Sequence, residues 1–342
     1  MNGKIIPDNG FAVTEMNFGN LTKMAICKKD SPALMIYQLK KAIENYKILN
    51  MSSQNVFTLI NPQTGNLAFK ILPFDDNSHF DHLQRNNFFS LIWVTKGKGN
   101  VKADFAQHQF EENSLLAFSP YQPFMLCVKE PIEGIAIHFH PDFYCIHMHQ
   151  KEVSCSGVLF NNVYQPPFVK ITDEASAIFK MVLDQMKTEI QNTDLAQYES
   201  LVSYLKIFLI TASRLKNQQL EEMKSIPNSK EPFILQNLKD AIEDNFKTKH
   251  SAGNYADMLN ISAKALAKLS KNYFNKTLTD LIAERIIIEA KRELYMTNKS
   301  VKEIAYELGY DDEHYFSRFF KTNADVSPQL YRETVGFGKM EA

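Results

Sequence analysis

Cysteine is scarce in this sequence, with Cys27, Cys127, Cys145 and Cys155 as its only examples in 342 residues. None of them belongs to a CxxC pair, and so few cysteines in so long a chain do not make a disulfide framework. No apolar run approaches the roughly 20 residues that a membrane-spanning helix needs. The first residues also lack the basic and apolar segments of a signal peptide. We therefore expect a cytoplasmic protein with reduced thiols and no membrane partner.

Positive charge is not in excess either, because 38 lysines and arginines stand against 39 aspartates and glutamates. The formal net charge of −1 excludes a protein that binds nucleic acid through its bulk charge, so any such contact must come from local placement of basic residues. The apolar fraction of 44% is normal for a folded protein. The length predicts two domains rather than one core.

Short segments rich in β-branched and aromatic residues follow one another between residues 55 and 165. They are 88–95 (FFSLIWVT), 101–105, 114–118, 124–128 and 134–140. Closely spaced short strands with turn signals between them, such as Gly97-Lys98-Gly99, predict a small barrel or sandwich. Apolar residues then recur at helical spacing over 178–190 and 201–209, which predicts a helical hairpin.

These patterns divide the chain into five parts. The first is expected to be a weakly structured or helical extension, with a helix over 33–49, and a translation start at Met51 would remove it from the native protein. The parts are 1–50 (extension), 51–170 (β domain), 171–218 (helical hairpin, expected to dimerise), 219–232 (linker) and 233–336 (all-helical domain).

The clearest motif lies between residues 300 and 321. Ser300-Val-Lys-Glu303 is a capping box and predicts the start of a short helix. Gly309 suits the left-handed residue that ends this helix, and Asp311 or Asp312 can cap the next one. Two short helices joined by a glycine-containing turn are typical of a helix-turn-helix unit, whose second helix enters the major groove of DNA.

Residues 255–271 repeat this plan. A short helix over 255–259, a turn at 260–261 and a second helix capped by Ser262 are expected. Lys264, Lys268 and Lys271 on one outward face suit contact with phosphates and base edges. A merely solvated face is the alternative, and the surrounding helix-turn-helix pattern favours contact with DNA.

A long helix is expected between the two units, from the capping box of Thr277 and Asp280 to about Thr297. Its apolar residues recur every four positions and give one continuous stripe. Such a helix can hold two recognition helices about 34 Å apart, the spacing of successive major grooves. Nine basic residues against four acidic ones over 264–302 favour contact with DNA in this part of the chain.

Residues 234–335 resemble the DNA-binding domain of AraC-type transcription regulators. The resemblance rests on 255–262 (YADMLNIS), 282–294 (IAERIIIEAKREL), 304–321 (IAYELGYDDEHYFSRFFK) and 327–332 (SPQLYR). It implies a regulator that binds double-stranded DNA through the outward faces of both recognition helices, with RNA polymerase as a further partner. The residues expected to contact DNA are Lys264, Ala267, Lys268 and Lys271 in the first helix and Glu313, His314, Ser317, Arg318 and Lys321 in the second.

Two positions in the first unit depart from the family pattern. Ser270 stands where the family usually has phenylalanine, and Asn275 stands where it usually has glycine. Asparagine tolerates a positive φ, so we expect the turn after the helix to persist. The packing of this unit is less securely predicted than that of the second.

Residues 89–99, 114–120 and 137–140 are similar to the cupin-like sensor domain of the same family. The resemblance implies an N-terminal cupin-like β-barrel with a helical hairpin, followed by an all-α tandem helix-turn-helix domain. It also implies a small-molecule effector in the barrel and a homodimer formed through the hairpin. Trp93 and the strand phenylalanines could line the effector pocket, although core packing is the favoured interpretation.

Four histidines at 138, 140, 147 and 149 could bind a metal, as His-x-His pairs do in cupin enzymes. No glutamate follows at the cupin spacing, so histidines on a strand face and in a polar loop are favoured. The sequence also has no nucleophile paired with a base and no glycine-rich phosphate loop. We therefore expect no enzymatic activity, no metal and no cofactor.

Two alternatives stay open. A cupin enzyme with an appended DNA-binding domain would contain bound metal. A regulator controlled by a protein partner, or by its own abundance, would bind no small-molecule effector.

Overall fold

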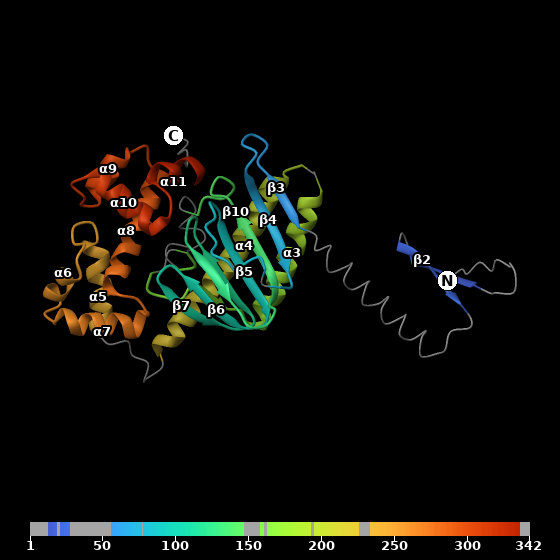
Figure 1. Ribbon diagram of the computed structural model, residues 1–342, viewed down its shortest axis with the longest axis horizontal. Helices are drawn as coiled ribbons and strands as arrows, with labels where there is room; N and C mark the ends of the chain where they lie inside the picture. Colours follow the sequence, from blue (N-terminus) through green and yellow to red (C-terminus); the bar gives the residue numbers. More distant parts are fainter. Residues whose placement is uncertain are drawn as a thin grey trace. The chain divides into compact units, whose positions relative to one another are not determined.

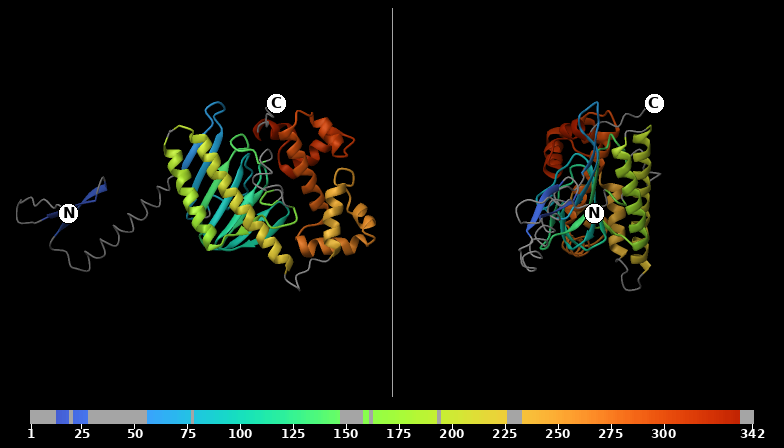
Figure 2. Two further views of the ribbon diagram at one scale, coloured as in Figure 1. Left: turned by 180° about the vertical axis from the view of Figure 1, so that it is seen from behind. Right: turned by 90° about the vertical axis from the view of Figure 1, so that its right-hand side faces the viewer.

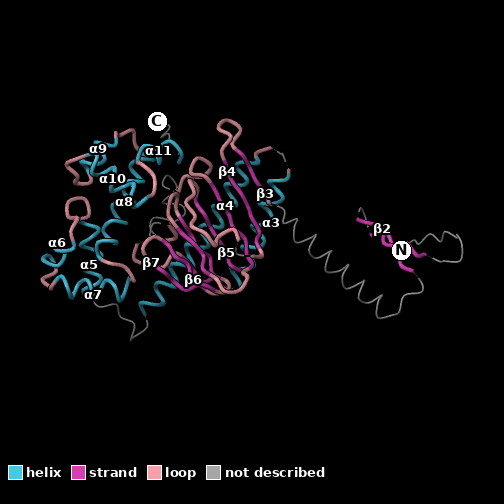
Figure 3. Tube along the Cα trace, in the orientation of Figure 1, coloured by secondary structure: helices cyan, strands magenta, loops and turns pink. Residues whose placement is uncertain are grey.

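The computed structural model describes residues 13–18, 21–27, 56–76, 78–146, 158–160, 163–192, 195–225 and 233–335. The chain divides into two compact units, Met1–Asn55 and Val56–Ala342, and each is described by itself. In the second unit, residues 56–225 contain strands and two helices, whereas the described elements of residues 233–335 are all helices (Figure 3). We call these parts the sheet region and the helical region.

The first unit contains an antiparallel strand pair. Strand β1 (Val13–Phe18) pairs with β2 (Leu21–Cys27), and Phe18 lies opposite Leu21. The two residues between the strands are glycine and asparagine, a pair that favours a tight hairpin. The prediction of a weakly structured or helical extension is therefore wrong for these two strands. The helix expected over 33–49 lies outside the described residues.

The sheet region contains two antiparallel sheets (Figure 1). One has six strands in the order β11-β8-β5-β10-β4-β3, and the other has three in the order β7-β6-β9. The strands are β3 (Phe57–Ile60), β4 (Leu67–Phe74), β5 (Phe89–Lys96), β6 (Gly99–Ala103), β7 (Ala106–Phe110), β8 (Ser114–Phe118), β9 (Phe124–Cys127), β10 (Glu133–Phe139) and β11 (Phe168–Lys170). The five strands predicted from sequence are present, and β3, β4, β7 and β11 are additional.

Strand β5 is buried on both faces in the middle of the six-stranded sheet. Leu91 and Trp93 face a core that is shared with two helices, whereas Ile92 and Val94 face the three-stranded sheet. A strand that is covered on both faces has no polar side to expose. This explains why its sequence is a continuous apolar run rather than an alternation.

The two sheets do not close into a barrel within the described residues. They face each other across an apolar core in which Phe118 stacks on Phe124, with ring centroids 3.8 Å apart. The prediction that these strands close into a cupin-like barrel is therefore wrong. Pro120 and Pro123 lie between β8 and β9, and proline has no N–H to continue a ladder across that connection.

Two helices cover the outer face of the six-stranded sheet (Figure 2). They are α3 (Asp173–Gln191) and α4 (Gln197–Ser225). Phe179 of α3 meets Trp93 edge-on, with ring centroids 5.7 Å apart. Ile178 and Met181, in contrast, are 39% and 60% exposed. Part of the apolar pattern that predicts this hairpin therefore faces away from the sheet.

The helical region is organised around one long central helix, α8. Its buried residues, such as Ile286 and Leu294, share one core with the six shorter helices. The helices are α5 (Phe233–Asn245), α6 (Ala252–Met258), α7 (Ala263–Phe274), α8 (Leu278–Met296), α9 (Val301–Glu307), α10 (Glu313–Ala324) and α11 (Pro328–Val335). None of the helices described along the chain is both long and apolar enough to cross a membrane.

Candidate nucleic-acid interface

The second helix-turn-helix unit consists of α9 and α10. Ser300 and Glu303 accept hydrogen bonds from each other's backbone N–H groups, so the predicted capping box is confirmed. Gly309 has a φ of +77°, as expected for the residue that ends α9. Of the two aspartates that could cap α10, Asp312 is the one that does so.

Helix α10 turns one face to the core and the other outward. Phe316 and Phe320 are fully buried between the helices. The five residues that we predicted to contact DNA lie on the other side of the helix. Of these, His314, Arg318 and Lys321 are exposed and Glu313 and Ser317 are half-buried.

The first unit, α6 and α7, has the same construction. Ser262 accepts from the backbone N–H of Ala265 and caps α7, as predicted. Helix α6 begins earlier than predicted, because Ser251 and Asn254 form a capping box at its start. The sequence signal for this start is Ser-x-x-Asn, a weaker form of the usual Ser-x-x-Glu pattern. Asn260 in the turn has a φ of +53°.

The two departures from the family pattern both have a structural role. Ser270 is fully buried, and its hydroxyl donates to the carbonyl of Lys276 at 2.9 Å, which closes the turn after α7. Asn275 has a φ of +57°, so the expectation that it replaces glycine in the left-handed conformation is confirmed. Lys264, Ala267, Lys268 and Lys271 are all exposed on the outward side of α7.

The basic residues between 264 and 302 do not all face outward. Lys276 pairs with Glu284 at 2.6 Å, and Arg292 pairs with Glu289 at 2.7 Å. The partners of Arg285, Lys291 and Lys299 are likewise protein groups, either carboxylates or carbonyls. The local excess of basic residues therefore overstates the charge that is free for DNA, because these five of the nine basic residues bond to other protein groups.

Helices α8 and α11 make several of the contacts between the helical region and the sheet region. The carbonyl of Thr334 accepts from Asn87 Nδ2 at 2.9 Å and from His140 Nε2 at 3.0 Å. Lys291 Nζ donates to the carbonyls of Pro120 and Tyr121 at 3.0 and 3.2 Å. Sequence reasoning did not identify these contacts, because the partners are far apart in the chain and no local pattern marks them.

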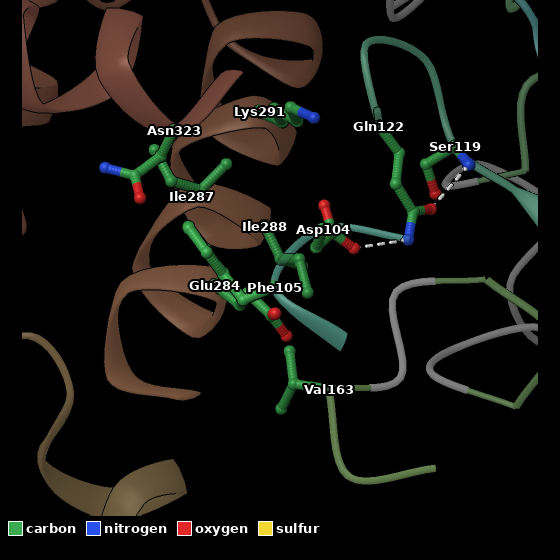
Figure 4. A pocket seen from close by; sticks show the side chains of 10 residues that line it. All are labelled: Asp104, Phe105, Ser119, Gln122, Val163, Glu284, Ile287, Ile288, Lys291 and Asn323. Carbon is green, nitrogen blue, oxygen red and sulfur yellow. Dashed lines mark hydrogen bonds between the residues drawn. The ribbon is translucent and has the colours of Figure 1, made fainter. Parts of the chain in front are cut away.

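A small cavity of about 50 Å³ lies where α8 faces the β6–β7 turn (Figure 4). Asp104 lines it from the sheet region and Glu284 lines it from α8. Burial raises the pKa of Glu284 to about 8, against the opposing effect of Lys276, and burial lowers the pKa of Lys291 to about 8. The interface thus contains charged groups that are costly to desolvate.

A second cavity, of about 470 Å³, lies beside the turn between β3 and β4. Its lining includes Asn66 in that turn, Ala68 of β4, His140 and Phe143 just after β10, and Tyr198 of α4. Its volume falls in the range that small-molecule sites occupy.

The other predicted candidates lie in the sheet region. Trp93 is part of the core between sheet and helices. The Nδ1 atom of His138 lies 3.0 Å from the hydroxyl of Ser90, and burial lowers the pKa of His138 to about 3. The histidines at 147 and 149 lie outside the described residues. Among the described residues, no group of three or more metal-binding side chains comes together.

Comparison with protein families and curated proteins gives matches to transcriptional regulators. A family model described as a helix-turn-helix domain matches residues 255–334. The uncharacterized HTH-type transcriptional regulator in the cgkA 5′ region of Pseudoalteromonas carrageenovora is 32% identical over 123 residues, which are 36% of this chain and 70% of that protein. The HTH-type regulator YfiF of Bacillus subtilis is 22% identical over 270 residues, which are 76% of this chain and 81% of that protein. The raffinose operon regulator RafR of Pediococcus pentosaceus is 32% identical over 95 residues, and this chain spans 34% of its length.

Two solved structures are also similar. The C-terminal domain of AraT, a response regulator from Geobacillus stearothermophilus, is 28% identical with a TM-score of 0.31, over 33% of this chain and 92% of that one. ToxT from Vibrio cholerae, bound to (E)-4-(8-methylnaphthalen-1-yl)but-3-enoic acid, is 15% identical with a TM-score of 0.36, over 82% of this chain and 98% of that one.

Proposed function

The chain belongs to the AraC-type helix-turn-helix transcription regulators, and from this premise we propose that it reads a two-part DNA site with both of its recognition helices, α7 and α10. One observation carries the proposal. Each recognition helix has 12 residues, a side-chain N-cap and an outward face with exposed basic residues. Two such helices can enter successive major grooves on one face of the duplex, about 34 Å apart.

The two recognition helices differ in the groups that they offer to DNA. The outward face of α7 carries three lysines, which suit phosphate contacts that position the protein. The outward face of α10 offers His314, Ser317 and Arg318, whose side chains can donate to base edges, and arginine pairs with guanine through two hydrogen bonds. We therefore assign most of the base recognition to α10 and most of the backbone contact to α7.

The test is selection of genomic DNA fragments by the purified protein at physiological salt. We expect enrichment of a site with two short elements about one helical turn apart. Arg318→Ala should weaken selection for the element that α10 reads, and Lys268→Ala should weaken binding with less effect on which sequences are selected. No enrichment, either with the protein alone or with added cell extract, would contradict the proposal.

We further propose that a small-molecule effector controls the protein from the sheet region. The 470 Å³ cavity beside the β3–β4 turn supports this, because both faces of the six-stranded sheet are already filled by side chains. A metabolite panel should include a compound that raises the unfolding temperature. Tyr198→Ala should remove that shift, and Tyr306→Ala, on the exposed side of α9, should keep it. The absence of any shift would favour control by a protein partner or by abundance.

A homodimer through α3 and α4 is the assembly that we propose. Ile178 and Met181 on α3 and Ile207 on α4 are exposed, and clusters of exposed apolar side chains often mark interfaces. Mass measurement in solution at micromolar concentration should give a dimer, and Met181→Lys should give a monomer. A monomeric wild-type protein would contradict the assembly without affecting DNA binding by a single chain.

We also propose RNA polymerase as a partner of the protein once it is bound to DNA.

A further inference from the structure

The two recognition helices end in the same unusual way. Helix α7 ends at Asn275 with a φ of +57°, and α10 ends at Asp325 with a φ of +61°. Glycine is the usual residue for this left-handed position because it has no Cβ to strain. Asparagine and aspartate tolerate this conformation better than other residues that have a Cβ. The backbone conformation therefore permits both caps, and the contacts that their side chains make are a separate feature.

Both of these cap side chains contact the sheet region. Asn275 Nδ2 donates to the carbonyl of Gln107 at 2.9 Å. Arg85 Nε donates to Asp325 Oδ2 at 2.6 Å. The residues that end the two recognition helices therefore both form hydrogen bonds with the sheet region.

The two contacts come from opposite edges of the three-stranded sheet. Gln107 lies on β7, the edge strand on one side. Arg85 follows Gln84, which forms an isolated bridge with Phe124 of β9, the edge strand on the other side. Between these edges, the β6–β7 turn faces α8 across the small cavity (Figure 4). The sheet therefore spans from the end of one recognition helix to the end of the other.

This attachment leaves the proposed DNA-binding faces free. The sheet region contacts α7 and α10 at their C-terminal ends, through Phe274 and Asn275 on one helix and Asp325 on the other. Lys264, Lys268, His314 and Arg318 are exposed along the helices. The contacts can therefore persist when both helices enter the major groove. A contact that masked the recognition helices would instead have to bury these residues.

We propose that the three-stranded sheet sets the separation of the two recognition helices, with Arg85 and Asp325 on one side and Asn275 and the Gln107 carbonyl on the other as positioning groups. The proposal rests on the proposed reading of a two-part site. Its consequence is that the sheet region restricts the spacings between the two DNA elements at which the protein binds. This role is separate from that of any effector site in the same region.

The test uses the full chain with Asn275→Gly, Asp325→Gly and the double variant. Glycine keeps the left-handed cap and removes only the side chain that reaches the sheet region. The DNA is the site selected by the wild-type protein, rebuilt with its two elements moved closer or farther apart by one or two base pairs. We expect the wild type to prefer the original spacing. In each variant, the ratio of the affinity for the original spacing to the affinity for an altered spacing should fall roughly two- to fivefold. This is the size of effect expected for the loss of one exposed polar contact.

Asn260→Gly is the matched control, because Asn260 is also exposed, also has a positive φ of +53°, and lies in the α6–α7 turn. It should leave the spacing preference unchanged. Arg85→Ala should reproduce the effect of Asp325→Gly, and combining the two should add nothing further.

The outcomes separate this inference from the proposed function. Failure of the wild type to select any two-part site would contradict the proposed function itself. Selection of such a site, with the same spacing preference in the wild type and the double variant, would overturn the positioning role. An equal loss of affinity at every spacing would overturn it too, because positioning acts on spacing and not on affinity alone.

Discussion

Gly309 is a residue at which the second helix-turn-helix unit should be sensitive to substitution. Its φ is +77°, and a Cβ at this position would lie 2.2 Å from the carbonyl oxygen of Lys247. Gly309→Ala should therefore lower the free energy of unfolding by more than the roughly 1–2 kcal/mol that a left-handed alanine costs by itself. Denaturant unfolding of the full chain measures this. Gly65→Ala is the control, because Gly65 has a φ of +71° with nothing within 4 Å.

Arg318 and Lys271 differ in what they should contribute to binding. Arg318→Ala should weaken binding to the selected site by about 1–3 kcal/mol, and binding to unrelated DNA by much less, if the arginine contacts a base. Lys271→Ala should weaken binding to all sequences about equally and reduce the salt dependence by about one phosphate contact. Titrations of both DNAs at several salt concentrations measure the two effects. Identical behaviour of the two variants would contradict this assignment.

At the scale of single elements, the start of α9 depends on one hydroxyl. Ser300→Ala removes the acceptor for the Glu303 N–H and should cost about 1 kcal/mol of stability. It should also weaken binding to the DNA element that α10 reads. Ser203→Ala is the control, because that hydroxyl only bonds back to Glu199 within α4 and should cost little. Equal losses in the two variants would mean that the cap has no special role.

The elements of the helical region could be predicted because their signals are local. The N-caps Ser262, Thr277 and Ser300 lie within three residues of the N–H groups that they satisfy. The same reasoning failed for α8, where basic side chains appeared to be available for DNA. Lys291, for example, reaches the carbonyl of Pro120, which is 171 residues away in the chain. No periodicity in a sequence can reveal such a partner.

The sheet region was harder to predict for a related reason. The alternating and continuous apolar runs identified β5, β6, β8, β9 and β10, but the pairing of distant strands determines whether two sheets close into a barrel. Strand β4 contains Pro73, which breaks the usual strand pattern. Of the candidate site, helical periodicity predicted which residues of the two recognition helices lie on the side away from the core, and their contact with DNA stays a prediction. Their attachment to the sheet region could not.

At the scale of the whole molecule, the interface between sheet region and helical region should respond to pH. The pKa of Glu284 is raised by burial from 4.5 to about 8, so the folded protein keeps a proton that the unfolded chain releases. The contribution of Glu284 to stability should therefore fall as the pH rises from about 4.5 to 8, by at most about 1.4 kcal/mol per pH unit. Asp104, whose pKa burial also raises, acts in the same direction. His138 and His108 act in the opposite direction below pH 6.5, because burial lowers their pKa values to about 3 and about 4, so a net fall in stability is expected between pH 6.5 and 8.

Lys291 has the opposite effect at higher pH. Burial lowers its pKa from 10.5 to about 8, so stability should rise again between these values. Denaturant unfolding across this range should give a minimum near pH 8. Glu284→Gln should reduce the slope on the acidic side, with Asp104, Lys276 and Asp280 as the remaining charges near that position. Glu333→Gln, at an exposed site on α11, should leave the profile unchanged, and an unchanged profile in Glu284→Gln would contradict the assignment.

The position of β5 in its sheet also has a consequence for biosynthesis. Both of its hydrogen-bonded neighbours, β8 and β10, come later in the chain. At roughly 5–20 residues per second, the ribosome therefore leaves an apolar strand with two open edges for several seconds. Such a strand is a template for pairing with other nascent chains. We expect the yield of native protein to depend on chaperones that shield this segment during translation, a dependence that the locally stabilised helical region does not share.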